Sequence, residues 1–543
     1  MTPSKSKYQS KLSILLAMAV IAGMFGLSLL ALTPQDAAAQ GPDDLPPWTD
    51  NQIAADGPLS GDVTLYQQEV TCQNEIETPG YYAGLGAQEI ADAQRSALFP
   101  CFNFLGSFDG PNEVFAWRSA DYYQGAAFVV NRMPGEMYLL GGVNPPLTGT
   151  VPAGPYLSKL NATTGDEMWR TYFENANASG AWIGGTNLNI LPNGNIVQSW
   201  SNKIALVDGD TGLILNATTL PTGDAPANNA NFKHLTIAPD GTIIVKDQTR
   251  PIGLDMQGTG AIIAGNIMGG FEQPNSIIHA VDPETLEVLD SIQLPEPSTV
   301  PHIITEYDGK IAIYVGLDTT GRRYFWDPVA QELAADDSWV VTVTVDGQTT
   351  PDAPTVIGDW IAFQTNGLGS PTTASSIVVV NQQDPTRMET IFPFGELQPG
   401  QRSFAPPKPN ADPDNNMIYS ADAGVGKVAG ISIDQETGAL ETVWVVDNTT
   451  NTFQPLIGPS DQRIILLTNQ GTQANGEPGE QQTWRNAATG EIIAESDFFE
   501  PLTFNSLVNV GYGGRVYFPT DNGFLVLQAM PARDDPPGAP IDE

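Results

Sequence analysis

The sequence predicts an all-β protein built around a single β-propeller, and three observations carry this prediction. Glycine (54 residues) and proline (44 residues) are abundant in the chain of 543 residues, as in proteins with many tight turns. From about residue 114 onward, short runs rich in β-branched and aromatic residues alternate polar and apolar positions, which is the pattern of half-buried strands. One motif also recurs at a spacing typical of propeller blades, which contain four short strands each.

The first 39 residues (1–39) are predicted to form a secretory signal peptide. Several lysines precede an apolar stretch over 12–32, and the small residues Ala37–Ala39 supply a cleavage site. The apolar stretch is about as long as a membrane-spanning helix, so an anchor that is not cleaved is the alternative. We expect an exported protein, periplasmic or extracellular (secreted), with no integral membrane domain after the signal is cleaved.

Residues 40–113 are predicted to contain a linker and an N-terminal segment held by one disulfide bond. The stretch 40–58 is rich in proline and aspartate, and the stretch 87–98 has a composition compatible with a helix. The two cysteines, Cys72 and Cys101, are expected to pair in an oxidising compartment. The alternative is two unpaired, buried thiols. Because the chain has no C-x-x-C motif, it supports neither a thioredoxin-like site nor a cysteine-zinc site.

The propeller is predicted over residues 114–531. Its motif consists of an apolar run, Asp or Asn, two further residues, Thr-Gly and a second apolar run. The Asp or Asn of successive copies stands at Asn161, Asp208, Asp282, Asp327, Asn381, Asp434 and Asn486, and the copies at Asp327 and Asn381 are weaker matches to the motif. Neighbouring copies lie 45 to 54 residues apart, except for one gap of 74 residues that holds a glycine-rich insertion near 250–275. We interpret this insertion as a surface loop.

A second pattern lies between these copies and consists of two alternating apolar runs joined by Asn-Gly or Asp-Gly. It occurs at Asn193-Gly194, Asp240-Gly241 and Asp308-Gly309, and it is a strong signal for a β-hairpin. Each blade is therefore predicted to contain one hairpin of each kind.

The number of blades follows from counting these units. Seven units fit between about 126 and 498, and an eighth over 505–530 lacks its fourth strand. A strand predicted over 114–119 would complete the eighth blade and close the ring, which removes exposed sheet edges there. Seven-bladed and eight-bladed rings both fit the sequence, and we favour eight. An acidic, proline-rich tail follows over 532–543.

The charge of the chain limits its partners. The sequence has 62 acidic and 23 basic residues, for a net charge of −39, although charged residues make up only 16% of the chain. The acidity therefore reflects a deficit of lysine and arginine. It argues against nucleic acid and anionic lipid as partners, because phosphate binding requires those cations. We expect a monomer whose partner is a protein, a polysaccharide or a small-molecule ligand.

One copy of the motif resembles the repeat of pyrroloquinoline-quinone (PQQ) propellers, in which Asp, two residues, Thr-Gly, three residues and Trp follow one another. Asn161, Thr164, Gly165 and Trp169 match this pattern, with Asn in place of Asp. Other copies match its front half and lack the closing Trp. The resemblance implies that Thr-Gly forms a tight turn and that the Trp packs between blades.

The superfamily that shares this repeat includes quinoprotein alcohol dehydrogenases and non-catalytic scaffolds such as the outer-membrane assembly factor. The dehydrogenases carry adjacent cysteines against the quinone, whereas Cys72 and Cys101 are far apart in this sequence. The assembly factor is a lipoprotein, and no cysteine follows the apolar stretch of this chain. The resemblance therefore implies a quinoprotein-like repeat propeller that is close to neither branch. It makes PQQ a less favoured cofactor than calcium, and the cofactor stays unknown.

Three residues are candidates for ligand binding. His234 and His302 each precede an Asp-Gly turn by six residues, and Asn187 precedes Asn193-Gly194 by the same distance. This register would place all three at the start of innermost strands, near one mouth of the central channel, where propellers usually bind ligands. Histidine there serves as a metal ligand or a general base. The alternative is that these side chains only hydrogen-bond the backbone.

A weaker metal candidate lies in the stretch that contains Asp412, Asp414 and Asn416, whose oxygen side chains alternate. Calcium prefers such ligands, but Met417 and Ala423 stand where an EF-hand loop needs Gly and Glu. The alternative is a solvated turn between two strands.

Two classes of function remain open on this evidence. The first is an exported binding or scaffold protein that presents its channel mouth to a partner. The alternative is a propeller enzyme with its site at the central channel, either an atypical quinoprotein-like oxidoreductase or a lyase or hydrolase that works around His234 and His302.

Overall fold

The structure is a computed structural model of the chain, and it describes residues 78–118, 127–141, 155–162, 165–173, 187–249, 252, 272–345, 347–349, 353–367, 371–404, 408–450, 455–502, 506–520 and 523–532. The predicted signal peptide, Cys72 and nearly all of the predicted C-terminal tail lie outside these residues. So does most of the glycine-rich insertion near 250–275.

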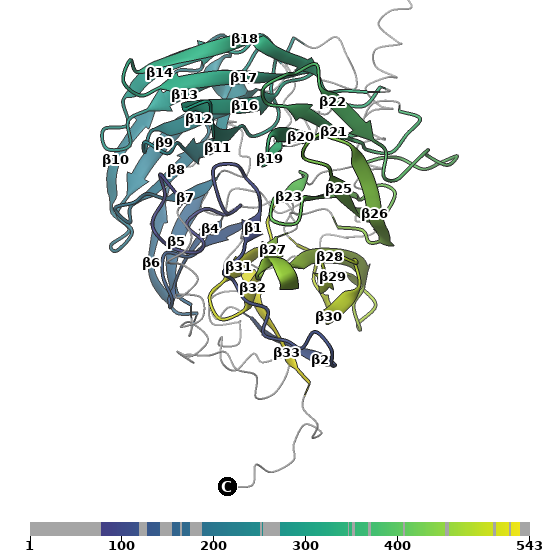
Figure 1. The fold of residues 1–543 in the computed structure, drawn as a ribbon. Helices are drawn as coiled ribbons and strands as arrows, with labels where there is room; N and C mark the ends of the chain where they lie inside the picture. Colours follow the sequence, from purple (N-terminus) through teal and green to yellow (C-terminus); the bar gives the residue numbers. More distant parts are fainter. Residues whose placement is uncertain are drawn as a thin grey trace, which may run out of the picture.

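Eight β-sheets stand in a ring around a central channel, as Figure 1 shows. The first four blades, each given from the innermost strand outward, are β3 (Phe128–Val130), β4 (Glu136–Gly141), β5 (Tyr156–Asn161) and β6 (Glu167–Tyr172); β7 (Leu188–Ile190), β8 (Ile196–Trp200), β9 (Lys203–Val207) and β10 (Ile214–Thr219); β11 (Ala230–Ile237), β12 (Ile243–Thr249), β13 (Ile277–Val281) and β14 (Val288–Gln293); and β15 (Ile303–Tyr307), β16 (Lys310–Gly316), β17 (Thr320–Asp327) and β18 (Glu332–Thr342).

The remaining four blades follow the same order. They are β19 (Thr355–Ile357), β20 (Trp360–Gln364), β21 (Ile377–Asn381) and β22 (Met388–Ile391); β23 (Asn410–Asp412), β24 (Met417–Asp422), β25 (Lys427–Ile433) and β26 (Leu440–Asp447); β27 (Leu456–Ile457), β28 (Ile464–Thr472), β29 (Pro478–Asn486) and β30 (Ile492–Phe499); and β31 (Asn509–Gly511), β32 (Arg515–Thr520), β33 (Gly523–Pro531) and β2 (Asn112–Arg118).

The prediction of an all-β propeller with eight blades is confirmed, and so is its mode of closure. The outermost strand of blade 8 is β2, which comes from the N-terminal side of the ring and pairs with β33 from Asn112 opposite Pro531 to Arg118 opposite Leu525. The ring is thus fastened by strands from both ends of the propeller. This arrangement leaves neither the first nor the last blade incomplete.

In blades 2 to 7, the Asp or Asn of the repeat stabilises the turn between the third and fourth strands. In blade 2, Asp208 Oδ1 accepts hydrogen bonds from the backbone N–H of Asp210 at 3.0 Å and from the N–H and Oγ1 of Thr211 at 2.7 and 2.9 Å. The next residue, Gly212, has a φ of +73°, which is a conformation that glycine adopts without strain. The repeat is therefore a turn signal with a physical cause.

A tryptophan of one blade packs against this glycine of the next blade, as the family resemblance implied. The Trp169 ring lies so close to Gly212 that an added Cβ would meet it at 2.6 Å. Trp444 covers Gly490 in the same way and donates from its Nε1 to the Ala487 carbonyl at 3.0 Å. Trp444 stands two residues beyond the position that the repeat pattern specifies. The pairing of β25 with β26 is irregular nearby, with a register shift between Gly430 and Ile431.

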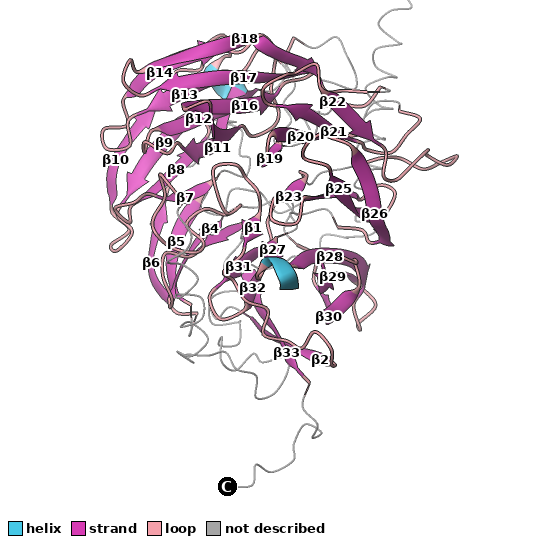
Figure 2. Ribbon diagram, in the orientation of Figure 1, coloured by secondary structure: helices cyan, strands magenta, loops and turns pink. Residues whose placement is uncertain are grey.

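The helix-compatible composition of residues 87–98 is misleading, because the structure has no helix there. These residues form turns that lead into β1 (Leu98–Phe99), which pairs in parallel with β27. Figure 2 shows how little helix the described residues contain: two single 3-10 turns, Ala227–Asn229 and Ser460–Gln462. No helix among the described residues has the length and apolar character needed to cross a bilayer.

Candidate functional site

The N-terminal residues 78–104, called here the channel segment, fill the central channel of the ring (Figure 1). The segment enters at the end of the innermost strands, where the Tyr82 N–H donates to the Ile190 carbonyl at 3.0 Å. It reaches the start of those strands at Glu89, whose Oε2 accepts from the Leu188 N–H at 3.0 Å. It then returns, because the Phe102 carbonyl accepts from the N–H of Gly458, just beyond β27. The segment is therefore a U-shaped plug.

Among the described residues, hydrogen bonds from seven of the eight blades hold the channel segment. The contacts, in blade order 1, 2, 3, 4, 6, 7 and 8, are Asn131 N–H to Gly86 O (2.8 Å), Ile190 N–H to Ala87 O (2.9 Å), Ile237 N–H to Tyr81 Oη (3.0 Å), Ile304 N–H to Ala93 O (2.8 Å), Ala411 N–H to Ser96 O (3.4 Å), Leu456 N–H to Ala97 O (2.8 Å) and Asn509 Nδ2 to Glu89 O (2.9 Å). Because each bond satisfies a buried backbone group, the segment takes part in the folded core.

Asn187 joins the channel segment to two blades. It precedes β7, as predicted, and its Nδ2 donates to Glu89 Oε1 while its Oδ1 accepts from the Leu235 N–H of blade 3 at 2.9 Å. Glu89 also lies 3.9 Å from the guanidinium of Arg95, and both side chains are buried. Burial raises the pKa of Glu89, whereas Arg95 and these hydrogen bonds oppose the rise.

His234 and His302 lie close to one another at the interface of blades 3 and 4. His302 directly precedes β15, as predicted, whereas His234 lies inside β11, opposite Lys246 of β12. The exposed fractions of His234 and His302 are 1% and 0%. Burial lowers the pKa of both imidazoles well below the usual range, and Lys246 and Arg95 act in the same direction. Both rings are therefore neutral near pH 7.

Some nitrogen atoms of these histidines lack a hydrogen-bond partner of good geometry among the described residues. They are Nδ1 of His234 and both ring nitrogens of His302. A buried imidazole without partners cannot exchange protons with a substrate unless the surrounding structure opens. The structure thus brings Asn187, His234 and His302 to one region of the channel and covers all three.

Sequence reasoning missed the charged residues that share this region. Lys246 is fully buried, and its Nζ donates to the Asp247 and Ser298 carbonyls at 2.6 and 3.2 Å. Burial lowers the pKa of Lys246 and raises the pKa of its neighbour Asp247. The available signal was a Lys-Asp pair inside the apolar strand that begins at Ile243. Glu89 had no such signal, since its partner Asn187 lies 98 residues away in sequence.

PQQ is the group that the family resemblance implies for the channel, and the residues present do not fit it. A planar quinone of three fused rings requires open space beside the channel axis. The channel segment occupies that space, with Ile90 and Ala97 almost fully buried, and the sequence has no adjacent cysteines. The channel of this chain therefore does not fit PQQ.

The weaker metal candidate contains carboxylates that already have a cationic partner. Nε of Arg463 donates to Asp412 Oδ2 at 3.0 Å, and Nη2 of Arg463 donates to Asp414 Oδ2 at 2.7 Å. Asn416 sits in the tight turn with a φ of +52°. The part of the chain that the structure describes holds no cluster of three or more His, Cys, Asp or Glu side chains suited to a metal ion. These contacts favour the structural alternative for Asp412, Asp414 and Asn416.

The predicted disulfide stays a prediction, because Cys72 lies outside the described residues. Its expected partner, Cys101, is buried at the end of the channel segment.

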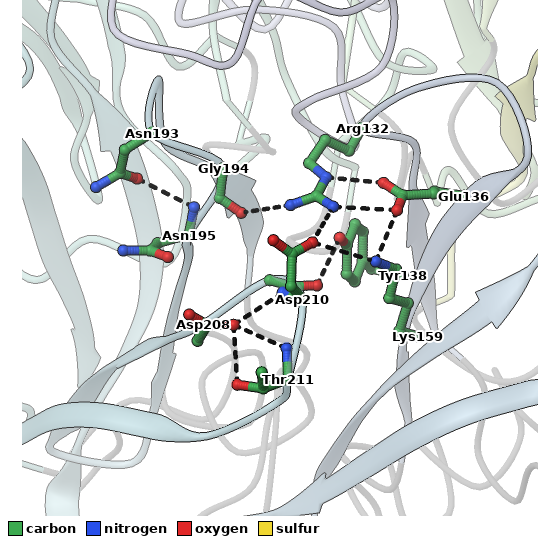
Figure 3. A network of polar contacts seen from close by, with 11 residues as sticks. Arg132, Glu136, Tyr138, Lys159, Asn193, Gly194, Asn195, Asp208, Asp210 and Thr211 are labelled. Carbon is green, nitrogen blue, oxygen red and sulfur yellow. Dashed lines mark hydrogen bonds and ion pairs between the residues drawn. The ribbon is translucent and has the colours of Figure 1, made fainter.

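A second polar cluster joins blades 1 and 2 on the face that carries their tight turns (Figure 3). Arg132 Nε donates to Glu136 Oε2 at 2.8 Å, and Lys159 Nζ lies 2.7 Å from Glu136 Oε1. Asp210 of blade 2 accepts from Arg132 and lies 3.5 Å from Lys159. The hydrogen bond from Arg132 lowers the pKa of Asp210. Because both cations face carboxylates of this chain, the cluster is a clamp between blades.

The chain matches known proteins in structure and not in sequence. No protein-family profile matches it, and no curated protein does. The quinohemoprotein alcohol dehydrogenase from Comamonas testosteroni superposes with a TM-score of 0.54 at 11% identity, over 88% of this chain and 86% of that one. A quinohemoprotein alcohol dehydrogenase from Pseudomonas putida HK5 gives a TM-score of 0.52 at 10% identity, over 90% and 85% of the two chains.

A europium-containing methanol dehydrogenase gives a TM-score of 0.50 at 10% identity, over 86% of this chain and all (100%) of that one. At such identities the likeness concerns the fold and says nothing of activity. The chain therefore has the β-propeller fold of these dehydrogenases, and its repeat motif resembles that of PQQ propellers.

Proposed function

We propose that this chain is an exported β-propeller that acts as a binding or scaffold protein and meets its partner on the outside of its blades. One observation carries the proposal: the channel, where propellers usually bind ligands, is occupied by residues 78–104 of the same chain. The sequence suggested the channel mouth as the binding surface. Because Asn187 there is engaged with Glu89 and His234 and His302 are covered, we place that surface on the blades.

The sequence supports the rest of this proposal. The stretch 1–39 has the features of a secretory signal, which supports a periplasmic or extracellular location. Pairing of Cys72 with Cys101 would fit such a compartment. We favour a protein as the partner, because the outer strands offer extended backbone edges to another chain.

An enzyme remains the second candidate, and one observation favours it. Lys246 is fully buried beside His234 and His302, and its pKa is lowered, which favours the neutral, nucleophilic amine. A substrate would reach this amine only if the channel segment moved away.

Two measurements on the mature protein distinguish the two functions: whether the protein retains PQQ and whether it oxidises alcohols. The protein is purified, incubated with PQQ and calcium, passed through a desalting column and examined by absorption, metal analysis and dye-linked oxidation of alcohols. The scaffold proposal predicts no retained quinone and no turnover. Stoichiometric quinone together with turnover that is lost in H234A and H302A would contradict it.

A second experiment looks for the partner protein itself. A photo-crosslinking residue is placed on the outer strands in one set of variants and near the channel mouth in another. The proposal predicts a defined crosslinked partner protein in the native host from outer-strand positions. A crosslink obtained only from the channel mouth would contradict the placement of the surface.

A further inference from the structure

The outermost strand of blade 2, β10, differs from the outermost strands of all other blades. Its sequence, ILNATT over Ile214–Thr219, contains no charged residue. Each of the other seven outermost strands contains at least one, namely Glu113 in β2, Glu167 in β6, Asp290 in β14, Glu332 in β18, Glu389 in β22, Glu441 in β26 and Glu495 in β30. The lack of charge is therefore a local property of β10.

The start of β10 also exposes three consecutive large apolar side chains. Leu213, Ile214 and Leu215 are 65%, 45% and 51% exposed. Farther along the strand, Ala217 and Thr219 are exposed as well. Leu213 directly precedes the strand, and Ile214 and Leu215 belong to it. Single exposed apolar residues are common, but three in a row are typical of an interaction surface.

The position of β10 makes its backbone available to another strand. It stands at the end of its sheet, paired on one side with β9 alone. An edge strand presents unpaired N–H and C=O groups, and proteins usually protect such an edge with charged residues, which are costly to bury in a new pair. The other outermost strands have that protection, whereas β10 has none.

Charges around β10 indicate what kind of strand it would accept. Asp224 follows the strand and is exposed, and Asp210, which precedes the strand, is exposed although it pairs with Arg132 and Lys159. The Asn216 side chain donates to the Thr285 carbonyl at 2.6 Å, which places the turn with the exposed Glu284 and Glu287 of blade 3 beside the strand. The uncharged edge is therefore surrounded by carboxylates, although Lys203 of β9 stands opposite Thr219.

We propose that β10 receives an extended segment of a partner protein as an added antiparallel or parallel strand, and that this segment is apolar at alternate positions and flanked by lysine or arginine. The inference rests on the proposed scaffold function and names the surface and the partner class. A second copy of this chain is a poorer occupant, because its own Asp224, Glu284 and Glu287 and its net charge of −39 would face the same carboxylates.

The test uses a fluorescently labelled synthetic peptide with alternating Val and Thr over six positions and two lysines at each end. Fluorescence anisotropy measures its affinity for the mature protein and for A217K and A217E. Both substitutions place a charge on the edge, so both are expected to weaken binding by about tenfold, which corresponds to about 1.4 kcal/mol. The matched controls V445K and V445E alter an exposed valine of β26 and are expected to bind like the unmodified protein.

Three results would overturn the proposal. One is binding that A217K weakens and A217E strengthens, because simple attraction between opposite charges would then explain it. Another is hydrogen exchange in which the peptide fails to protect the amides of β10. The third is dimerisation of the chain that A217K abolishes, because the occupant would then be a second copy. Each variant is first compared with the unmodified protein by circular dichroism to establish that it is folded.

The proposed function and this inference fail separately. A partner that crosslinks to other outermost strands, together with a peptide that does not bind β10, would overturn the inference and leave the scaffold function standing. Retained quinone with turnover would overturn the scaffold function itself.

Discussion

The central channel and the outer edge of blade 2 distribute their side chains in opposite ways. The channel buries the charged residues Glu89, Arg95 and Lys246, whereas the outer edge exposes the apolar residues Leu213 and Ile214. In the channel, the charges contact groups of the same chain, and the channel segment is held by seven blades. At the outer edge, the apolar residues have no comparable covering. The contrast indicates that the buried charges help to hold the channel together, and it is the basis of the proposal that a partner binds on the outside of the ring.

The largest expected effect comes from breaking the buried contacts in the channel. E89A removes the carboxylate that binds Asn187 and Leu188 and lies 3.9 Å from the guanidinium of Arg95, so it takes one partner out of a buried charged pair. Loss of one partner of a buried pair typically costs about 3–5 kcal/mol of unfolding free energy. Denaturant unfolding of E89A measures this cost, with the exposed Glu306 changed in E306A as the control. Equal losses in both variants would contradict a structural role for the channel segment.

A second prediction concerns the pH dependence of stability. The pKa of His302 is well below its usual range in the folded state, so the unfolded chain binds a proton that the folded chain does not. Stability from this histidine is therefore present above about pH 6.5 and is lost below it, at about 1.4 kcal/mol per pH unit. In H302Q this loss should disappear, so the stability difference between H302Q and the unmodified protein should change with that slope between about pH 6.5 and 5.5. Parallel pH curves would show that His302 becomes protonated in the folded state.

A smaller effect is expected at the clamp between blades 1 and 2. Asp210 is 72% exposed, although it contacts the nearly buried Arg132 and Lys159. Because solvent screens this carboxylate, D210A should cost about 1 kcal/mol or less, and high salt should reduce the cost. Unfolding at low and high ionic strength measures the difference. A loss as large as that of E89A would place the clamp, rather than the channel, at the centre of stability.

The smallest effect on stability is expected at the outer edge. Ala217 is exposed on β10, so A217K should change the unfolding free energy by no more than about 0.5 kcal/mol while it weakens peptide binding. A denaturation curve measured on the same sample as the anisotropy experiment separates the two quantities. A marked loss of stability would mean that β10 is part of the core rather than an open edge.

The sequence predicted the ring and its closure because these depend on local patterns. The turn that Asp208 and Gly212 form recurs at Asp434 and Gly438, and the strand over 114–119 was the obvious candidate for the missing fourth strand. The packing of Trp444 against the next blade was not predicted, because Trp444 stands two residues away from the position that the repeat spacing requires. The stretch 87–98 has a composition compatible with a helix but forms turns, because contacts with distant blades decide its conformation and local propensity does not report them.

The candidate site was only partly predictable, for the same reason. The spacing of Asn187, His234 and His302 from the Asn-Gly and Asp-Gly turns predicted that they lie in one region, because these turns set the register of the innermost strands. The residues that cover them, such as Glu89, come from a segment that precedes the propeller and shows no repeat. A contact between residues nearly a hundred positions apart leaves no periodic trace in one sequence.

Hydrogen exchange of the mature protein without any ligand tests the central claim most directly. If residues 87–97 are part of the core, their amides will exchange as slowly as those of the buried strand β21 (Ile377–Asn381), while the exposed edge β10 exchanges quickly. Fast exchange over 87–97, with β21 still protected, would mean that the channel opens in solution. That result would contradict the account and return His234, His302 and Lys246 to consideration as an accessible site.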